Sequence, residues 1–323
     1  MNDTKQRGRI IITGASGFVG GRVARALQTS TRTVICTSRD PQRSRSANPT
    51  CRWERLDTER PETVDSLLRP GDRVFYLIHA MSDGPNYSER ESRGAHCFAE
   101  VARDRQVARI VYLGGPEPEG TPSRHLSSRL LTGEILRNSG VPTVELRASM
   151  IIGSGSESWH IVRDLAARLP VMVLPKWLQN HTQPVAIRDV VAALLHALDI
   201  DDEQCGVYDL PGPEILSFEE ILVRTARLRG SQPRRVHVPV LSPRLSAFWL
   251  RFVTGADMEV VSELVEGLRT DLVAEGEGFW RLMPDYRRTS FDDAAREALR
   301  YDEQHLSPTA SAAEAIVRRL ATH

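Results

Sequence analysis

The sequence has no excess of charge of either sign. Lysine and arginine together number 42, and aspartate and glutamate also number 42, so the formal net charge is zero. A balanced chain exerts no general attraction on nucleic acid or on an anionic membrane surface. We therefore expect neither a nucleic-acid partner nor a membrane partner, and the expected ligand is a small-molecule substrate.

Cysteine is scarce and shows no metal-binding pattern. The four cysteines, Cys36, Cys51, Cys97 and Cys205, form no Cys-x-x-Cys pair and fit no zinc spacing. The histidines also lack the spacing of metal ligands. We predict no metal site, and we expect the thiols of an intracellular protein to stay reduced.

Long apolar runs are absent as well. No run approaches the roughly 20 apolar residues that a membrane-spanning helix needs. The residues before Arg9 contain no apolar signal core. The most lipophilic late stretch, residues 245–253, is short and contains Arg251. These absences predict a cytoplasmic protein.

Strand-like and helix-like segments alternate through the first half of the chain. Short β-branched runs, typical of strands buried on both faces, are separated by segments with apolar residues at helical spacing. This alternation predicts an α/β fold of the Rossmann type, with a doubly wound parallel sheet. The expected strands cover residues 9–13, 33–37, 53–56, 73–78, 109–113 and 144–147, and the expected helices cover 19–27, 61–68, 89–103 and 124–137.

The pattern loosens after residue 150, where prolines become frequent. We therefore predict a Rossmann domain that binds NAD(P) over residues 1–150. Residues 151–323 are expected to form a smaller C-terminal substrate-binding region. Within it, part of 183–200 is expected to return to the Rossmann core, because residues 188–198 have helical spacing.

A glycine-rich turn follows the first expected strand and opens a helix. Gly14 permits a tight turn, Gly17 lets backbone N–H groups approach a pyrophosphate, and Gly20 allows close packing of helix on sheet. The helix N-terminus adds partial positive charge. The alternative is a turn retained for packing alone. The residues expected to contact a dinucleotide here are Gly14, Ser16, Gly17, Phe18, Val19 and Gly20.

The end of the second strand bears on the choice of cofactor. NAD-specific sites place an acidic side chain there, on the ribose 2′-hydroxyl. This chain has Ser38 and Arg39, and a guanidinium suits the 2′-phosphate of NADP(H). NADP(H) is therefore favoured, although Asp40 keeps NAD(H) possible and Arg39 can equally be a solvated surface residue. Asp57 is expected near the adenine, or else at a helix N-cap.

Residues that follow the fourth and fifth strands should also lie near the cofactor. The carboxyl ends of parallel strands line the ligand crevice of such sheets. We expect His79, Ala80 and Gly114 to contact the cofactor and Met81 to contact the substrate.

These features together resemble the atypical short-chain dehydrogenase/reductases, in their NmrA-like and NAD-dependent-epimerase-like branch. The resemblance implies a Rossmann fold, NAD(P)H binding and oxidoreductase chemistry, but it leaves the substrate open because the branch also contains epimerase relatives and redox-sensing regulators. The matching segments are residues 11–21, 38–41, 76–81, 109–115, 125–137, 145–153 and 183–189.

The chain departs from the wider superfamily at the Tyr-x-x-x-Lys pair. His125 and Arg129 occupy the same spacing, so they share one helix face, and Gly114-Gly115 replaces the usual serine after the fifth strand. We expect His125 to donate a proton near neutral pH and Arg129 to bind ribose hydroxyls or stabilise negative charge. Alternatively, both are structural, with Arg129 paired to Glu134 or another carboxylate.

The C-terminal region contributes aromatic residues. Trp159 and Trp177 are expected to line an apolar pocket for a flat substrate, although packing explains either one equally well. The sequence thus predicts an NAD(P)H-dependent reductase of a small carbonyl, quinone or conjugated acceptor. The alternative is a non-catalytic NAD(P)H-binding redox sensor that reports to a protein partner.

Overall fold

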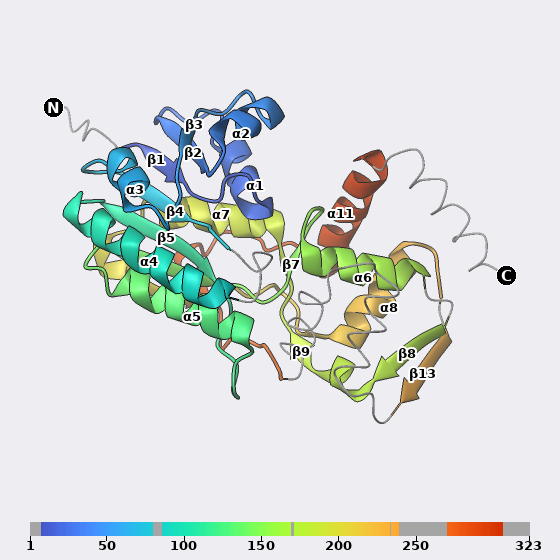
Figure 1. Ribbon diagram of the computed structural model, residues 1–323. Coiled ribbons are helices and arrows are strands. Elements are labelled where there is room, and N and C mark those ends of the chain that lie inside the picture. The colour runs from blue at the N-terminus through green and yellow to red at the C-terminus, as the bar shows by residue number, and fades with distance from the viewer. Residues whose placement is uncertain (1–7, 80–85, 169–170, 233, 239–269, 306–323) are drawn as a thin grey trace. The chain divides into compact units, whose positions relative to one another are not determined.

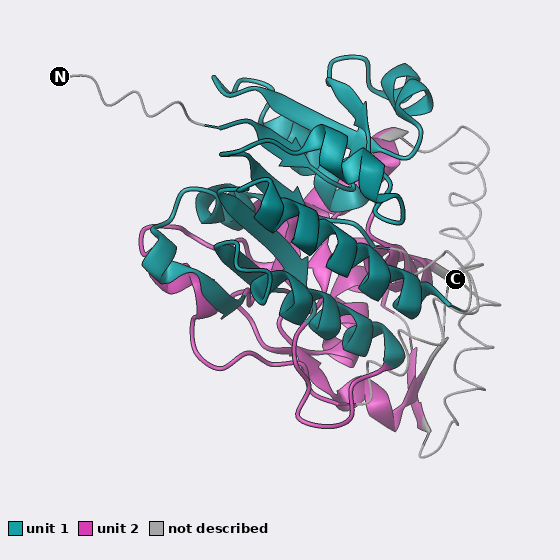
Figure 2. Ribbon diagram, turned by 60° about the vertical axis from the view of Figure 1, so that its left-hand side comes forward, with its two compact units in different colours: residues 1–115, 124–147, 190–209 teal, residues 116–123, 148–189, 210–323 magenta. Residues whose placement is uncertain are grey.

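The computed structural model describes residues 8–79, 86–168, 171–232, 234–238 and 270–305. The chain divides into two compact units, drawn in different colours in Figure 2. The N-terminal unit comprises residues 1–115, 124–147 and 190–209, and the C-terminal unit comprises residues 116–123, 148–189 and 210–323. Each unit is therefore built from separated stretches of the chain.

A seven-stranded sheet forms the centre of the N-terminal unit, in the order β11-β6-β5-β4-β1-β2-β3. Every neighbouring pair is parallel. This is the doubly wound Rossmann topology, so the predicted fold is confirmed. The strands are β1 (Ile10–Ile12), β2 (Val34–Ser38), β3 (Trp53–Arg55), β4 (Arg73–Tyr76), β5 (Arg109–Gly114), β6 (Thr143–Arg147) and β11 (Gly206–Asp209).

The apolar strands are continuous because the sheet is covered on both sides. β1 lies between β2 and β4, with Ile11 opposite Ile35 and Val74, and all three side chains are buried. A strand in that position has no solvated face, so it needs no alternation of polar and apolar residues.

Helices α3, α4 and α5 cover one face of this sheet, with α4 and α5 side by side (Figure 1). Phe98 and Ala99 of α4 are buried in the same apolar cluster as Ile135 and Leu136 of α5. The helices are α1 (Phe18–Ala26), α2 (Pro41–Ala47), α3 (Pro61–Leu67), α4 (Tyr87–Asp104), α5 (Arg124–Arg137), α7 (Ile187–Ala197) and the short η2 (Asp202–Gln204).

The C-terminal unit has short paired strands and an apolar core of its own. Strand β7 pairs with β10 and β8 with β13, both parallel, while β9 and β12 are antiparallel. The strands are β7 (Ile151–Ile152), β8 (Val171–Pro175), β9 (His181–Thr182), β10 (Val185–Ala186), β12 (Leu216–Ser217) and β13 (Arg234–Val238). The helices are α6 (Glu157–Arg168), η1 (Lys176–Gln179), α8 (Phe218–Leu228), η3 (Gly278–Leu282) and α11 (Phe291–His305).

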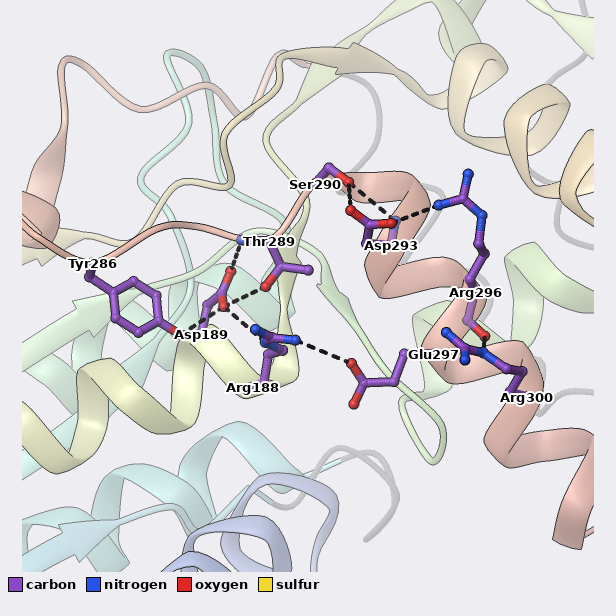
Figure 3. Close-up of polar contacts among 9 residues, drawn as sticks. All are labelled: Arg188, Asp189, Tyr286, Thr289, Ser290, Asp293, Arg296, Glu297 and Arg300. Atoms are coloured by element: carbon purple, nitrogen blue, oxygen red, sulfur yellow. Dashed lines mark hydrogen bonds and ion pairs between the residues drawn. The ribbon is translucent and has the colours of Figure 1, made fainter.

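Buried carboxylates connect distant segments within the C-terminal unit. Asp189 is fully buried and accepts hydrogen bonds from the hydroxyl of Tyr286 at 2.9 Å and from both the N–H and the hydroxyl of Thr289 at 2.7 and 2.8 Å (Figure 3). Arg188 lies 3.8 Å from the same carboxylate and forms an ion pair with it. These three hydrogen bonds hold residues 286–289 against Asp189, near the start of α7.

No helix within the described ranges is both long and apolar enough to cross a membrane.

Candidate functional site

The glycine-rich turn leads from β1 into α1 and requires glycine for steric reasons. Gly14 has a φ of 63°, and a Cβ atom there would lie 2.3 Å from the carbonyl oxygen of Leu77. A Cβ atom on Gly20 would lie 2.3 Å from the carbonyl oxygen of Gly14. The backbone of the turn therefore packs against the end of β4 on one side and against α1 on the other.

The N-terminus of α1 has the properties of a phosphate-binding site. Its N-cap residue is Gly17, which makes no side-chain capping bond, and its first turn contains no acidic residue. Ser16 is exposed, and Phe18 and Val19 are half-buried at the start of the helix. Unpaired N–H groups and the helix dipole favour an anion at this position. The backbone cradle thus fits the pyrophosphate of a nicotinamide dinucleotide.

At the end of β2, Asp40 is the N-cap of α2. Its carboxylate accepts a bond from the N–H of Arg43 at 3.0 Å, and its own N–H donates to the hydroxyl of Ser38 at 3.0 Å. The hydroxyl of Ser44 donates to that of Ser38 at 2.8 Å. The only acidic residue at this strand end is therefore engaged in capping a helix, among hydroxyl groups.

Arg39 is exposed next to this turn and belongs to a group of arginines around Glu59. The hydrogen bond from Arg90 lowers the pKa of Glu59, and the charges of Arg90, Arg93 and Arg39 act in the same direction. Positive charge thus accumulates where a cofactor's adenosine end is expected in this fold.

Asp57 follows β3, as expected. Its carboxylate accepts from the N–H of Glu59 at 3.2 Å and lies 3.6 Å from Arg60. Arg60, not Asp57, occupies the N-cap of α3, so the predicted helix-cap role is wrong. Asp57 instead closes the turn that precedes the helix. Its contact with adenine stays a prediction.

A polar cluster lies past the ends of β4 and β5. The Nδ1 atom of His79 lies 2.8 Å from Oε1 of Glu91, and the hydroxyl of Ser128 donates to Oε2 of Glu91. The rings of His79 and His125 are 4.7 Å apart, centre to centre. Four residues from a strand end, from α4 and from α5 are thereby brought together.

The charge state of His125 differs from the one that we expected. Burial, together with the charges of His79 and Arg129, lowers its pKa to about 3, while the charge of Glu91 acts in the opposite direction. The imidazole is therefore neutral at neutral pH, which disfavours our expectation that it donates a proton as an imidazolium. It can still donate a hydrogen bond from its neutral ring.

This lowered pKa predicts acid sensitivity. Between pH 6.5 and 3 the unfolded chain binds a proton at His125 that the folded chain does not, so stability falls as the pH falls. From neutral pH to pH 5 the loss amounts to about 2 kcal/mol. Urea unfolding at both pH values should show a smaller fall for His125→Gln. The exposed His96→Gln should behave like the parent, and an equal fall in all three would contradict the assignment.

Arg129 binds the strand end and not a carboxylate. Its guanidinium donates to the carbonyl of Leu113 and lies 5.5 Å from the ring of Tyr112, whose hydroxyl donates to the Arg129 carbonyl at 3.0 Å. Burial raises the pKa of Tyr112. The alternative pairing with Glu134 is thus replaced by a bond that fixes α5 to β5.

The missing serine after β5 also has a steric explanation. A Cβ atom on Gly114 would lie 3.1 Å from Oε1 of the fully buried Glu145. A Cβ atom on Gly115 would lie 2.7 Å from Cδ2 of Leu126. A serine at either position would press against buried neighbours, which leaves the proton-transfer role to other side chains.

The residues expected to contact the substrate are placed as follows. Trp159 is fully buried in the core of the C-terminal unit, where its indole N–H donates to Asp302 at 3.3 Å. A fully buried indole offers no surface to a ligand, so packing explains Trp159 better than substrate contact does. Trp177 is partly buried against the same core. Ala80 and Met81 lie outside the described residues.

Sequence reasoning did not single out Glu91 or Ser128. Both lie on charge-rich or polar helices. Glu91 is one of seven charged side chains between Glu89 and Asp104, and it does not belong to the apolar pattern of its helix. Their distances from His79 along the chain match no motif, so the sequence does not indicate that the three side chains meet. One sequence feature does point to Ser128. It lies three residues after His125, so the two side chains are neighbours on the surface of the same helix.

Comparison with known proteins agrees with this geometry. The model of the family described as "NAD dependent epimerase/dehydratase family" matches residues 10–209. Ceramide reductase of Caulobacter vibrioides (strain NA1000 / CB15N) is 25% identical over 73% of this chain and 75% of its own. The 3-diazoavenalumate denitrifying reductase of Streptomyces sp is 22% identical over 75% of this chain and 88% of its own.

A solved structure shares the fold over most of its length. Triphenylmethane reductase of Citrobacter sp., complexed with NADP(H), superposes with a TM-score of 0.72 at 17% identity, covering 90% of this chain and 99% of that chain. The resemblance to atypical short-chain dehydrogenase/reductases is confirmed. With its parallel sheet, glycine turn and matching family model, the chain belongs to the NAD dependent epimerase/dehydratase family.

Proposed function

We propose that this protein is an NADP(H)-dependent reductase of a small carbonyl, quinone or other conjugated acceptor. The observation that carries the proposal is the intact cofactor cradle at Gly14 and Gly20, beside a polar cluster that contains ionisable side chains. Three similar proteins are named reductases, and one was solved with NADP(H). Their similarity supports the reaction class, and the acceptor is our own inference.

The preference for NADP(H) rests on the end of β2. A carboxylate that recognises the ribose of NAD must present its oxygens to the 2′-hydroxyl. Asp40 uses its carboxylate to cap α2, while Ser38, Ser44 and the exposed Arg39 supply the hydroxyl and guanidinium groups that suit a phosphate. We infer that the 2′-phosphate of NADP(H) is bound there, with NAD(H) as the weaker ligand.

In this reaction the cofactor and the protein have different roles. A bound nicotinamide supplies the hydride, and the protein orients the acceptor and stabilises the charge that develops on it. His79, Glu91 and His125 are the titratable side chains gathered past the ends of β4 and β5. Arg129, fixed to the carbonyl of Leu113, holds a positive charge near the same strand ends.

Parallel calorimetric titrations with NADPH and NADH test the cofactor assignment. Arg39→Ala should weaken NADPH binding about 10- to 100-fold, because it removes charge-assisted hydrogen bonds to the phosphate, and should leave NADH binding nearly unchanged. Arg52→Ala is a matched control, since Arg52 is also exposed and is paired with Glu54.

Asp40→Asn separates the two cofactors further. Asparagine keeps a capping oxygen for α2 but removes the carboxylate charge. NADPH affinity should be unchanged or higher in this variant. A selective loss of NADH affinity would instead assign Asp40 to the ribose of NAD and overturn the preference for NADP(H).

A second candidate function, a redox sensor that binds NAD(P)H and a protein partner without turnover, is favoured by one observation. The usual tyrosine and lysine are replaced, and the replacing His125 is neutral, with its pKa lowered to about 3. A panel of carbonyls, quinones and conjugated cations, assayed by NADPH absorbance, separates the two functions. Steady oxidation with any acceptor supports the reductase, and none across the panel supports the sensor.

A further inference from the structure

Glu91 is a buried carboxylate whose two oxygens serve different partners. Its side chain is 7% exposed, with Oε1 at 2.8 Å from Nδ1 of His79 and Oε2 accepting from the hydroxyl of Ser128. Burying a charged carboxylate is costly unless hydrogen bonds compensate for the lost water. This arrangement therefore holds Glu91 in one orientation, directed at His79.

The bond to Glu91 also determines which nitrogen of His79 carries a proton. An ionised carboxylate only accepts hydrogen bonds, so Nδ1 of His79 is the donor in this pair. In the neutral ring Nε2 then has no proton and can take one up, and in the charged ring Nε2 can release one. The imidazole is thereby prepared for proton transfer through Nε2, and its side chain is 29% exposed.

His79 follows β4, at the edge of the sheet where ligands bind in this fold. β4 and β1 are neighbours at the point where the strand order reverses, and ligands bind at the carboxyl ends of such strands. The carbonyl of Leu77, two positions before His79, would lie 2.3 Å from a Cβ atom on Gly14. The chain leading to His79 thus packs directly against the glycine turn.

The neighbouring groups fit a proton donor at this position. Within the described residues, the titratable groups in contact with His79 are Glu91 from α4 and His125 from α5. Burial, and then the charge of His79, lower the pKa of His125, so His125 stays neutral beside a charged His79. His125 is therefore kept uncharged beside His79.

We propose that His79 is the proton donor of the reduction and that Glu91, held by Ser128, is its positioning residue; this rests on the reductase function proposed above. The acceptor carbon gains a hydride, with its two electrons, from the reduced nicotinamide. The C=O π pair moves to the acceptor oxygen, which forms an O–H bond as the Nε2–H bond of the His79 imidazolium breaks. The products are the alcohol, oxidised cofactor and neutral His79, which water reprotonates. Glu91 stays ionised throughout.

The test uses the full chain and the variants His79→Gln, Glu91→Gln and Ser128→Ala. With an acceptor from the panel above, His79→Gln should lower kcat about 10²- to 10⁴-fold, the usual contribution of general acid catalysis. Glu91→Gln should lower kcat about 10-fold and Ser128→Ala less. The NADPH affinity of Glu91→Gln and of Ser128→Ala, measured by calorimetry, should stay within about 3-fold of the parent, since neither change alters the glycine turn.

A second readout does not depend on turnover. Ring ¹⁵N shifts of histidine-labelled protein report which nitrogen carries the proton, and neutral His79 should be protonated on Nδ1 in the parent. Glu91→Gln should move that proton toward Nε2. Glu89→Gln, on the same helix but 76% exposed, is the matched control and should change neither the shifts nor kcat.

The outcomes separate the two proposals. If the parent oxidises NADPH with an acceptor and His79→Gln does so at the parent rate, the role of His79 is overturned and the reductase stands. A parent ring protonated on Nε2 overturns the role of Glu91. If the parent binds NADPH but reduces no acceptor, the reductase function fails and the role of His79 fails with it.

Discussion

Gly20→Ala is expected to abolish tight nucleotide binding, lowering NADPH affinity more than about 100-fold, and to destabilise the fold by about 3 kcal/mol. The new Cβ atom would lie 2.3 Å from the carbonyl oxygen of Gly14 and 2.8 Å from Cα of Ala15. Both are backbone atoms, so no side-chain rotation can relieve the overlap. Helix α1 must move away from the turn, and the N–H groups that face the pyrophosphate move with it.

Gly21→Ala is the matched control, one residue further along the same helix. The nearest atom to its new Cβ would be the carbonyl oxygen of Ala15, at 3.6 Å, which is ordinary contact. Because alanine is a better helix former than glycine, this variant should gain about 0.5–1 kcal/mol and keep its NADPH affinity. Calorimetry and urea unfolding of both variants measure the contrast. Equal behaviour of the two would show that close packing of α1 on the turn is not required.

Asp189→Ala should destabilise the protein by about 3–5 kcal/mol. The fully buried carboxylate accepts three hydrogen bonds, from the hydroxyl of Tyr286 and from the N–H and hydroxyl of Thr289. Its removal leaves the buried donors of Thr289 and the hydroxyl of the half-buried Tyr286 without their acceptor. The stacked contact between Tyr286 and Trp280, with ring centres 5.3 Å apart, should loosen as well. Urea unfolding measures the loss.

Asp293→Ala is the control for this change, and the same close-up shows it (Figure 3). The Asp293 side chain is 66% exposed and is paired with Arg296, which is 49% exposed. Exposed ion pairs contribute little, because water and salt screen both charges. The unfolding midpoint should therefore remain close to that of the parent. If Asp189→Ala were equally mild, the network around Asp189 would not be what holds residues 286–289 in place.

Local sequence patterns were sufficient for the Rossmann sheet and its glycine turn. The run Ile10–Ile12 is apolar at every position because this central strand is buried on both faces, and Gly14 is needed because its φ is positive. Both requirements act over a few neighbouring residues. The same holds for the replacement of tyrosine and lysine by His125 and Arg129, which share a helix face by spacing alone.

The function of individual side chains was less accessible, because it depends on contacts between distant segments. His125 occupies the position of the usual catalytic tyrosine, four residues before Arg129. Its pKa of about 3, however, results from burial beside His79 and Arg129, which the sequence does not reveal. Trp159 lies beyond the regular alternation of expected strands and helices, and only the packed core around α6, with Asp302, shows that it is buried.

The parallel α/β sheet, the glycine-rich turn and the departure from the Tyr-x-x-x-Lys pair can all be predicted from residue types at short spacing along the chain. Only the tertiary structure shows that Glu91 joins His79 to Ser128 and that His79 lies against His125. Those contacts depend on how helices and turns pack against the ends of the strands. Hydrogen-bond distances of about 3 Å are set by that packing, and spacing along the chain does not encode them.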